Sequence, residues 1–129
     1  MPSSEALTKG IRIEVTSRYV ADRSAPEDSE WFFAYTVRIT NQGSETVQLM
    51  SRHWIITDAN GRRQEVKGPG VVGEQPTLRP GESFEYTSAC PLSTSIGAMQ
   101  GTYQMVTGGG ERFDATIAPF TLSEPYAMN

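Results

Sequence analysis

Hydrophobic and polar residues alternate with a period of two along most of this chain. Ile11, Ile13 and Val15 alternate with polar residues and predict a first strand with one buried face. The strongest set lies between residues 31 and 39 and consists of Trp31, Phe33, Tyr35, Val37 and Ile39. Because residues two apart share one face of a strand, this segment is predicted to be a central strand with an aromatic-rich buried face.

The next run of alternation changes face part-way along. It begins at Val47 and Leu49, but Trp54 and Ile56 fall on the opposite parity, so the face changes near Arg52. Such a change predicts a β-bulge. Asn60-Gly61 then predicts a hairpin with a type I′ turn, which leads into a short strand at about 64–67.

Alternation resumes after a long segment, residues 68–81, that is rich in glycine and proline. It predicts strands over about 84–91, 99–105 and 113–122, the last two joined by a turn at 108–110. A parity shift at Pro119 is typical of an edge or bulged strand. The two ends, residues 1–10 and 123–129, have few apolar residues to pack and are expected to be loose.

These features predict an all-β fold in which about seven short strands form a two-sheet sandwich of the immunoglobulin type. A closed barrel is the alternative, because periodicity alone does not distinguish the two. The length, 129 residues, fits a single domain over 1–129. Its ordered core is expected over about 10–122.

Composition narrows the function classes. Eleven basic residues against fifteen acidic ones give a net charge of −4, which argues against binding to duplex nucleic acid. No apolar run approaches the ~20 residues needed to cross a bilayer, and Met1–Lys9 lacks the apolar core of a signal peptide. We therefore expect a soluble, cytoplasmic protein with no membrane association.

Metal and catalytic chemistry find little support in the sequence. His53 is the single histidine and Cys90 the single cysteine, so one chain cannot supply the ligands of a transition-metal site, and Cys90 is expected to be a structural thiol. An acidic segment lacks the fixed spacing of a Ca²⁺ loop; its members are Asp22, Glu27, Asp28 and Glu30. No nucleophile signature is present. The sequence predicts no enzyme activity, no cofactor and no metal site.

One glycine-rich segment matches G-x-G-x-x-G, the pattern of dinucleotide-binding loops. Pro76 and the lack of helical periodicity after it argue against that fold. Two interpretations remain: a backbone-amide nest for an anion, or glycines required by loop geometry. The candidate residues are Gly68, Gly70, Val71, Val72, Gly73 and Glu74. The surrounding sequence is locally basic, with Arg52, Arg62, Arg63, Lys67 and Arg79, of which Lys67 and Arg79 are the candidate supporting charges.

Several segments, in the same order along the chain, resemble the ApaG family over about residues 10–122. They are FAYTV at 33–37, Arg52-His53-Trp54 before Asn60-Gly61, GPGVVGEQP at 68–76, PGESFEYTS at 80–88 and GAMQGTYQM at 97–105. The last strand departs from the family pattern Ile-Pro-x-Phe, because Ala118 separates Ile117 from Pro119. The resemblance implies a fibronectin type III-like sandwich.

The resemblance also implies a functional context. The bacterial family is associated with cobalt resistance and magnesium efflux, and similar domains occur in eukaryotic F-box proteins and in a polymerase-delta-interacting protein. We therefore expect a non-enzymatic domain that binds an as yet unidentified protein through loops or an edge strand. The link to divalent-cation homeostasis comes from the resemblance alone.

The alternative is a weak sensor of phosphate or pyrophosphate that uses residues 68–73. A protein partner would need apolar anchors such as Val71 and Val72, whereas an anion needs free backbone amides.

Overall fold

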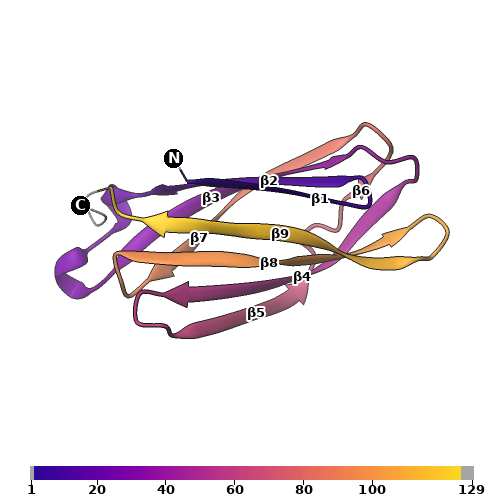
Figure 1. The fold of residues 1–129 in the computed structure, drawn as a ribbon. Coiled ribbons are helices and arrows are strands. Elements are labelled where there is room, and N and C mark those ends of the chain that lie inside the picture. The colour runs from indigo at the N-terminus through magenta and orange to yellow at the C-terminus, as the bar shows by residue number, and fades with distance from the viewer. Residues whose placement is uncertain (1, 126–129) are drawn as a thin grey trace.

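Two antiparallel sheets make up nearly all of the computed structural model, which describes residues 2–125 (Figure 1). The first sheet has the order β1-β2-β3-β7, with β1 (Ser3–Thr8), β2 (Ile11–Tyr19), β3 (Trp31–Asn41) and β7 (Ser83–Leu92). The second has the order β5-β4-β8-β9, with β4 (Val47–Asp58), β5 (Arg63–Pro69), β8 (Ile96–Thr107) and β9 (Arg112–Ser123), and the short β6 (Thr77–Leu78) also pairs with β4. Two single 3₁₀ turns, η1 (Ala21–Arg23) and η2 (Pro26–Asp28), connect β2 to β3. Within residues 2–125, no helix is long and apolar enough to cross a membrane.

The predicted sandwich is confirmed, and its core lies between the two sheets. Trp54 of β4 is at the centre: its ring centroid lies 5.3 Å from that of Tyr35, 6.2 Å from that of Tyr103 and 6.0 Å from that of Phe120. All four rings are buried. The alternating aromatic residues of the sequence therefore form the core, and the sheets stay separate rather than closing into a barrel.

The seven predicted strands are present, and the structure adds β1 and β6. Residues 3–8, which were expected to be loose, pair with β2 from Ser3↔Thr16 to Thr8↔Ile11. Lys9 (φ 47°) and Gly10 (φ 81°) form a two-residue turn with type I′ signs between these strands. Alternation did not reveal β1 because its half-buried positions are Ser4, Ala6 and Thr8, of which only Ala6 is apolar. Residues 126–129 of the expected loose end lie outside the described residues.

The predicted type I′ turn at Asn60-Gly61 is wrong. Gly61 has φ 82°, but Asn60 is not in the positive-φ region. The Asp58 carboxylate accepts the backbone N–H groups of Asn60 and Arg62, each at 2.9 Å, and Gly61 N–H donates to the Asp58 carbonyl at 3.1 Å. This is the three-residue hairpin in which glycine occupies the bulge position after a type I turn. The side chain of Asp58 favours it by binding two amides that would otherwise need water.

Both predicted bulges are confirmed. In β4 the register shifts between Leu49 and Ser51, so Met50 is the extra residue, two positions before the predicted one. Between β8 and β9, Met99 pairs with Phe120 and Gly101 pairs with Ile117. Ala118 and Pro119 of β9 therefore lie opposite a single residue of β8. Pro119 thus occupies a bulge in an edge strand, where it removes no ladder hydrogen bond.

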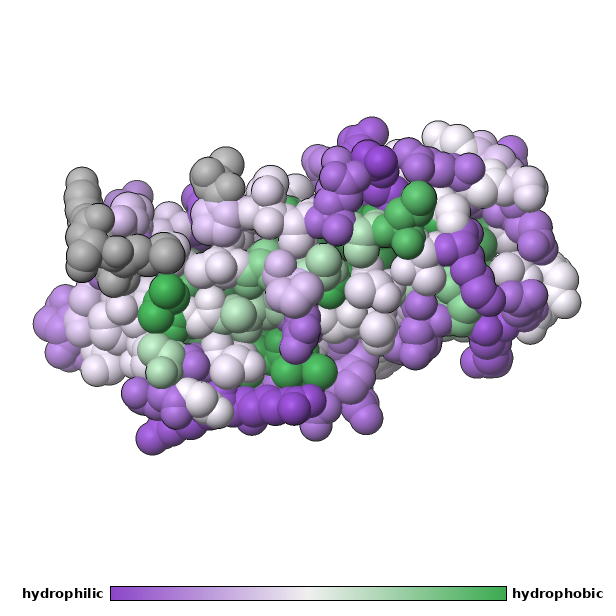
Figure 2. All heavy atoms as spheres, viewed as in Figure 1, coloured by the Kyte–Doolittle hydropathy of each residue, from purple (hydrophilic) through white to green (hydrophobic). Residues whose placement is uncertain are grey.

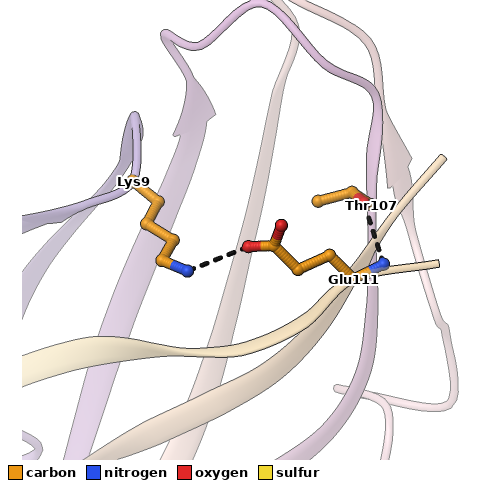
Figure 3. Close-up of polar contacts among 3 residues, drawn as sticks. All are labelled: Lys9, Thr107 and Glu111. Atoms are coloured by element: carbon orange, nitrogen blue, oxygen red, sulfur yellow. Dashed lines mark hydrogen bonds and ion pairs between the residues drawn. The ribbon is translucent and has the colours of Figure 1, made fainter. Parts of the chain in front are cut away.

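The two sheets approach each other along one side, where β9 lies beside β1 (Figure 1). The backbone N–H of Thr116 donates to Thr8 Oγ1 at 3.1 Å, and the Ser17 hydroxyl donates to the Thr121 carbonyl at 2.6 Å. At the end of this seam the Lys9 ammonium lies 2.9 Å from the Glu111 carboxylate, whose own backbone N–H is held by Thr107 Oγ1 (Figure 3). On the opposite side, no hydrogen bond joins β5 to β7 in residues 2–125.

Candidate functional site

The glycine-rich segment forms a small hairpin after β5. Val71 N–H donates to the Glu74 carbonyl and Glu74 N–H to the Val71 carbonyl, both at 2.8 Å. Val72 (φ 43°) and Gly73 (φ 82°) form the turn between them. Positive φ at both central residues is the sign of a type I′ turn. The turn type predicted for Asn60-Gly61 therefore occurs here, at a sequence that contains a β-branched residue.

The three glycines of this loop differ in what a side chain at their position would meet. At Gly68 a Cβ would come within 3.1 Å of the terminal nitrogens of Arg52, so the Arg52 side chain would have to shift slightly to make room for it. At Gly70 (φ 61°) a Cβ would overlap the carbonyl oxygen of Glu74. At Gly73 a Cβ would meet open space, and only the positive φ favours glycine. Local geometry thus gives a reason for glycine at each of the three positions.

Arg52 and the bulge of β4 hold the loop in place. Nη1 of Arg52 donates to the carbonyls of Pro69 and Gly70, each at 2.9 Å. The carbonyl of the bulged residue Met50 accepts the backbone N–H of Gly70 and the side-chain amide of Gln75, again each at 2.9 Å. These four hydrogen bonds, which we call the loop clasp, fix residues 69–75 against β4.

The amides expected to form an anion nest are only partly free. Those of Gly70 and Val71 donate to protein carbonyls, whereas those of Val72 and Gly73 have no partner between residues 2 and 125. Neither side chain proposed as a supporting charge forms a hydrogen bond or ion pair with residues 68–74 in this range. Lys67 lies on the outer face of the second sheet, and Arg79 follows β6, where its backbone N–H donates to the Glu82 carboxylate.

The two valines of the loop differ sharply in exposure. Val71 is 1% exposed and is part of the hydrophobic core, so it anchors the loop. Val72 is 55% exposed at the tip. Of the two apolar anchors that the sequence suggested, only Val72 is placed where a partner can contact it. Glu74, the last candidate residue, is exposed beside it.

Buried hydroxyl and thiol groups lie close to the clasp in the core. The hydroxyls of Tyr86 and Tyr103 are hydrogen-bonded to each other, and burial raises the pKa of both phenols. Burial likewise raises the pKa of the Cys90 thiol to about 11, which fits the structural role expected for it. Alternation predicts strands that contain both tyrosines but does not pair them, since Tyr86 and Tyr103 belong to different sheets.

His53 and the acidic segment, for which the sequence predicts no metal or catalytic role, lie elsewhere on the surface. His53 Nε2 is 2.9 Å from the carboxylate of Glu65, and this hydrogen bond holds the pKa of Glu65 below its usual value. Both residues lie on the outer face of the second sheet, and His53 lines a shallow hollow of ≈ 530 Å³. The acidic residues 22–30 are exposed around η1 and η2, and no cluster of three or more potential metal ligands occurs in residues 2–125.

Comparison with known proteins identifies the family. The family model for the ApaG domain matches residues 21–107, which include the loop and its clasp. The chain belongs to the ApaG family. Protein ApaG of Methylobacterium sp. is 57% identical over 122 residues, covering 95% of this chain and 94% of the relative. Protein ApaG of Bradyrhizobium diazoefficiens is 58% identical over 120 residues, covering 93% and 92%.

Solved structures agree with the ApaG assignment. A crystal structure described as the ApaA protein of Bordetella pertussis has a TM-score of 0.88 and 56% identity, and the match covers 91% of this chain and 95% of the other. The C-terminal domain of Wzt superposes with a TM-score of 0.56 at 8% identity, over 94% of this chain and 77% of that one. The second likeness shows the sandwich fold alone.

Proposed function

We propose that this ApaG domain is a non-enzymatic binding module that presents the tip of loop 68–76 to a protein partner. The observation that carries the proposal is Val72, an exposed β-branched residue with positive φ. A left-handed conformation costs such a residue about 1–2 kcal/mol. Strain of this kind persists when the surroundings impose it, and it is concentrated at functional sites.

The loop clasp supplies that constraint. Because hydrogen bonds from Arg52 and to Met50 hold both ends of the tip hairpin, an apolar side chain is presented with little freedom left to lose on binding. Few other apolar side chains are available to a partner: the exposed large hydrophobic residues in the described part of the chain are Leu7 and Val72. On the face seen in Figure 2, hydrophobic residues are scattered among hydrophilic ones.

The link to cobalt and magnesium that the family resemblance implies would then act through the partner. Calorimetry of the isolated protein with Co²⁺ and Mg²⁺ tests this part of the proposal. Weak, nonsaturating heats are expected, since hard cations need several convergent oxygen ligands. Stoichiometric binding to the protein alone would contradict a role that passes through a partner.

Two single variants test the loop proposal. Val72→Gly removes the apolar tip while keeping a residue that adopts positive φ without strain. Leu7→Ser removes the other exposed hydrophobic side chain and serves as the matched control. In affinity captures from the native cell, a protein retained by the wild type should be lost with Val72→Gly and kept with Leu7→Ser. Equal retention by Val72→Gly and wild type would refute the proposal.

The anion sensor is the second candidate, favoured by the two adjacent amides of Val72 and Gly73, which have no hydrogen-bond partner within the part of the chain that the structure describes. With two donors and no helix behind them, the dissociation constant for pyrophosphate should be roughly millimolar. Amide chemical shifts during titration at constant ionic strength provide the test. Saturable shifts confined to residues 72 and 73 would support anion binding by the loop, and uniform shifts would exclude it.

A further inference from the structure

The open side of the sandwich contains a groove between the free edges of β5 and β7. It consists of two adjoining cavities of ≈ 260 Å³ each, which share Ile56, Gln64 and Pro91. Buried side chains of both sheets form its floor: Tyr35, Trp54, Cys90 and Met99. Its rim is polar and includes three arginines, Arg52, Arg62 and Arg63.

Among residues 2–125, the backbone of β5 has hydrogen-bonding groups along this groove that no other strand uses. Asp58 N–H donates to the Arg62 carbonyl at 3.0 Å, where β4 turns into β5. In an antiparallel pair, hydrogen-bonded and non-hydrogen-bonded positions alternate from such a point. With the observed register, Arg63, Glu65 and Lys67 occupy the non-hydrogen-bonded positions, so their N–H and C=O groups point away from β4. These three residues form a free edge.

The side chains of β5 alternate in chemistry as well as in direction. Arg63, Glu65 and Lys67 share the outer face with the paired residues of β4, and Glu65 is already engaged by His53. Gln64 and Val66 line the groove above its apolar floor. A strand added beside β5 would therefore meet basic side chains on its outer face and an apolar surface on its groove face.

Charge adds a preference for acidic segments. Arg52, Arg62 and Arg63 form no salt bridge with any residue in the described range, and the nearby Asp58 carboxylate is occupied by two backbone amides. The groove rim is therefore locally positive on a chain with a net charge of −4. At physiological salt, charges more than about 8 Å away are largely screened, so the local arginines dominate the attraction.

We propose that β5 binds an extended segment of a partner protein, with alternating acidic and apolar residues, as an added strand in the groove between β5 and β7. Main-chain hydrogen bonds to Arg63, Glu65 and Lys67 supply affinity, as in other cases of strand addition. Arginine contacts to the acidic side chains and the apolar floor supply selectivity. This site goes beyond the loop proposal and does not depend on Val72.

The probe is a fluorescein-labelled octapeptide of alternating Glu and Val, and binding is read by anisotropy. Three peptides serve as controls: a Lys-Val octapeptide and two forms of the Glu-Val peptide N-methylated at either the valines or the glutamates. We expect saturable binding of the Glu-Val probe, no binding of the Lys-Val peptide, and loss of binding for at least one N-methylated form. Amide hydrogen exchange should slow at Arg63, Glu65 and Lys67 when the probe is bound.

Two charge reversals complete the test. Arg63→Glu should weaken probe binding about tenfold or more. Arg18→Glu changes the net charge equally on the exposed outer face of the first sheet and should leave affinity unchanged. Equal effects of the two reversals would show nonspecific attraction and overturn the proposal. Protection on β7 instead of β5, or no binding of the Glu-Val probe, would also overturn it. Val72→Gly should leave probe affinity intact, so this proposal and the loop proposal can fail separately.

Discussion

At the scale of single residues, the glycines of the loop make separable contributions to stability. Gly73→Ala introduces only the cost of positive φ, so the free energy of unfolding should fall by about 1–2 kcal/mol. Gly70→Ala has the same φ cost and also brings a Cβ into overlap with the Glu74 carbonyl. Its free energy of unfolding should therefore fall clearly more than that of Gly73→Ala. Urea unfolding of the two variants measures the difference. Equal losses would show that the loop relaxes around residue 70.

The buried tyrosines and Cys90 predict sensitivity to alkaline pH. Burial raises the pKa of Tyr86 and Tyr103 above their ordinary 10.0, and that of Cys90 from 9.0 to about 11. As pH rises, the unfolded chain loses these protons first, so stability is complete below about pH 9 and falls above it. The thiol alone contributes on the order of 2–3 kcal/mol.

Urea midpoints between pH 8 and 11 measure this loss. Cys90→Ala removes the thiol and should flatten the profile between pH 9 and 11, whatever its effect on stability at pH 8. A profile as steep as that of the wild type would show that Cys90 does not titrate differently on unfolding.

At the scale of elements, the loop clasp makes loop order depend on Arg52. Lys lacks the planar fork of a guanidinium and cannot reproduce its donor geometry. In Arg52→Lys, amide exchange at Gly70 and Val71 should therefore quicken about tenfold or more, equivalent to at least about 1.4 kcal/mol. Arg79→Lys is the matched control, because the Arg79 side chain forms no hydrogen bond with the loop in the described range. Unchanged exchange in Arg52→Lys would mean that the Met50 contacts suffice.

The elements also show how far sequence reasoning extends. Period-two alternation located six strands and two bulges, because the parity of a strand's residues determines which face they share, and the Asn60-Gly61 turn signal located the seventh strand. Alternation missed β1 and β6, which gain stability from backbone pairing with neighbours. The turn type predicted for Asn60-Gly61 was wrong because the Asp58 side chain, which binds two backbone amides of the turn, favours a different turn. The candidate loop was located by its glycines, but the clasp that holds it depends on Met50 and Arg52, which lie 17 or more residues earlier in the chain.

At the scale of the whole molecule, β1 protects the side of the sandwich where β9 lies. Deletion of residues 2–9 removes this cover and exposes the β9 edge. The truncated protein should melt at a lower temperature and associate as its concentration rises. Glu111→Gln, which removes only the exposed ion pair with Lys9, should change stability by less than about 1 kcal/mol. Calorimetry and light scattering measure both effects, and a monomeric truncation with wild-type melting would contradict the role assigned to β1.

The contact between β1 and β9 can form only late in synthesis of the chain. It joins residues 102 and 108 positions apart, near the two ends of the chain. At the ribosome's pace of about 5–20 residues per second, the first hairpin emerges roughly 5–20 seconds before the strand that covers it. During this interval the apolar face of β2 is not yet covered by β9. Slow translation of residues 112–123 would prolong that exposure, so the nascent chain's dependence on chaperones should track the speed with which its final dozen strand residues are made.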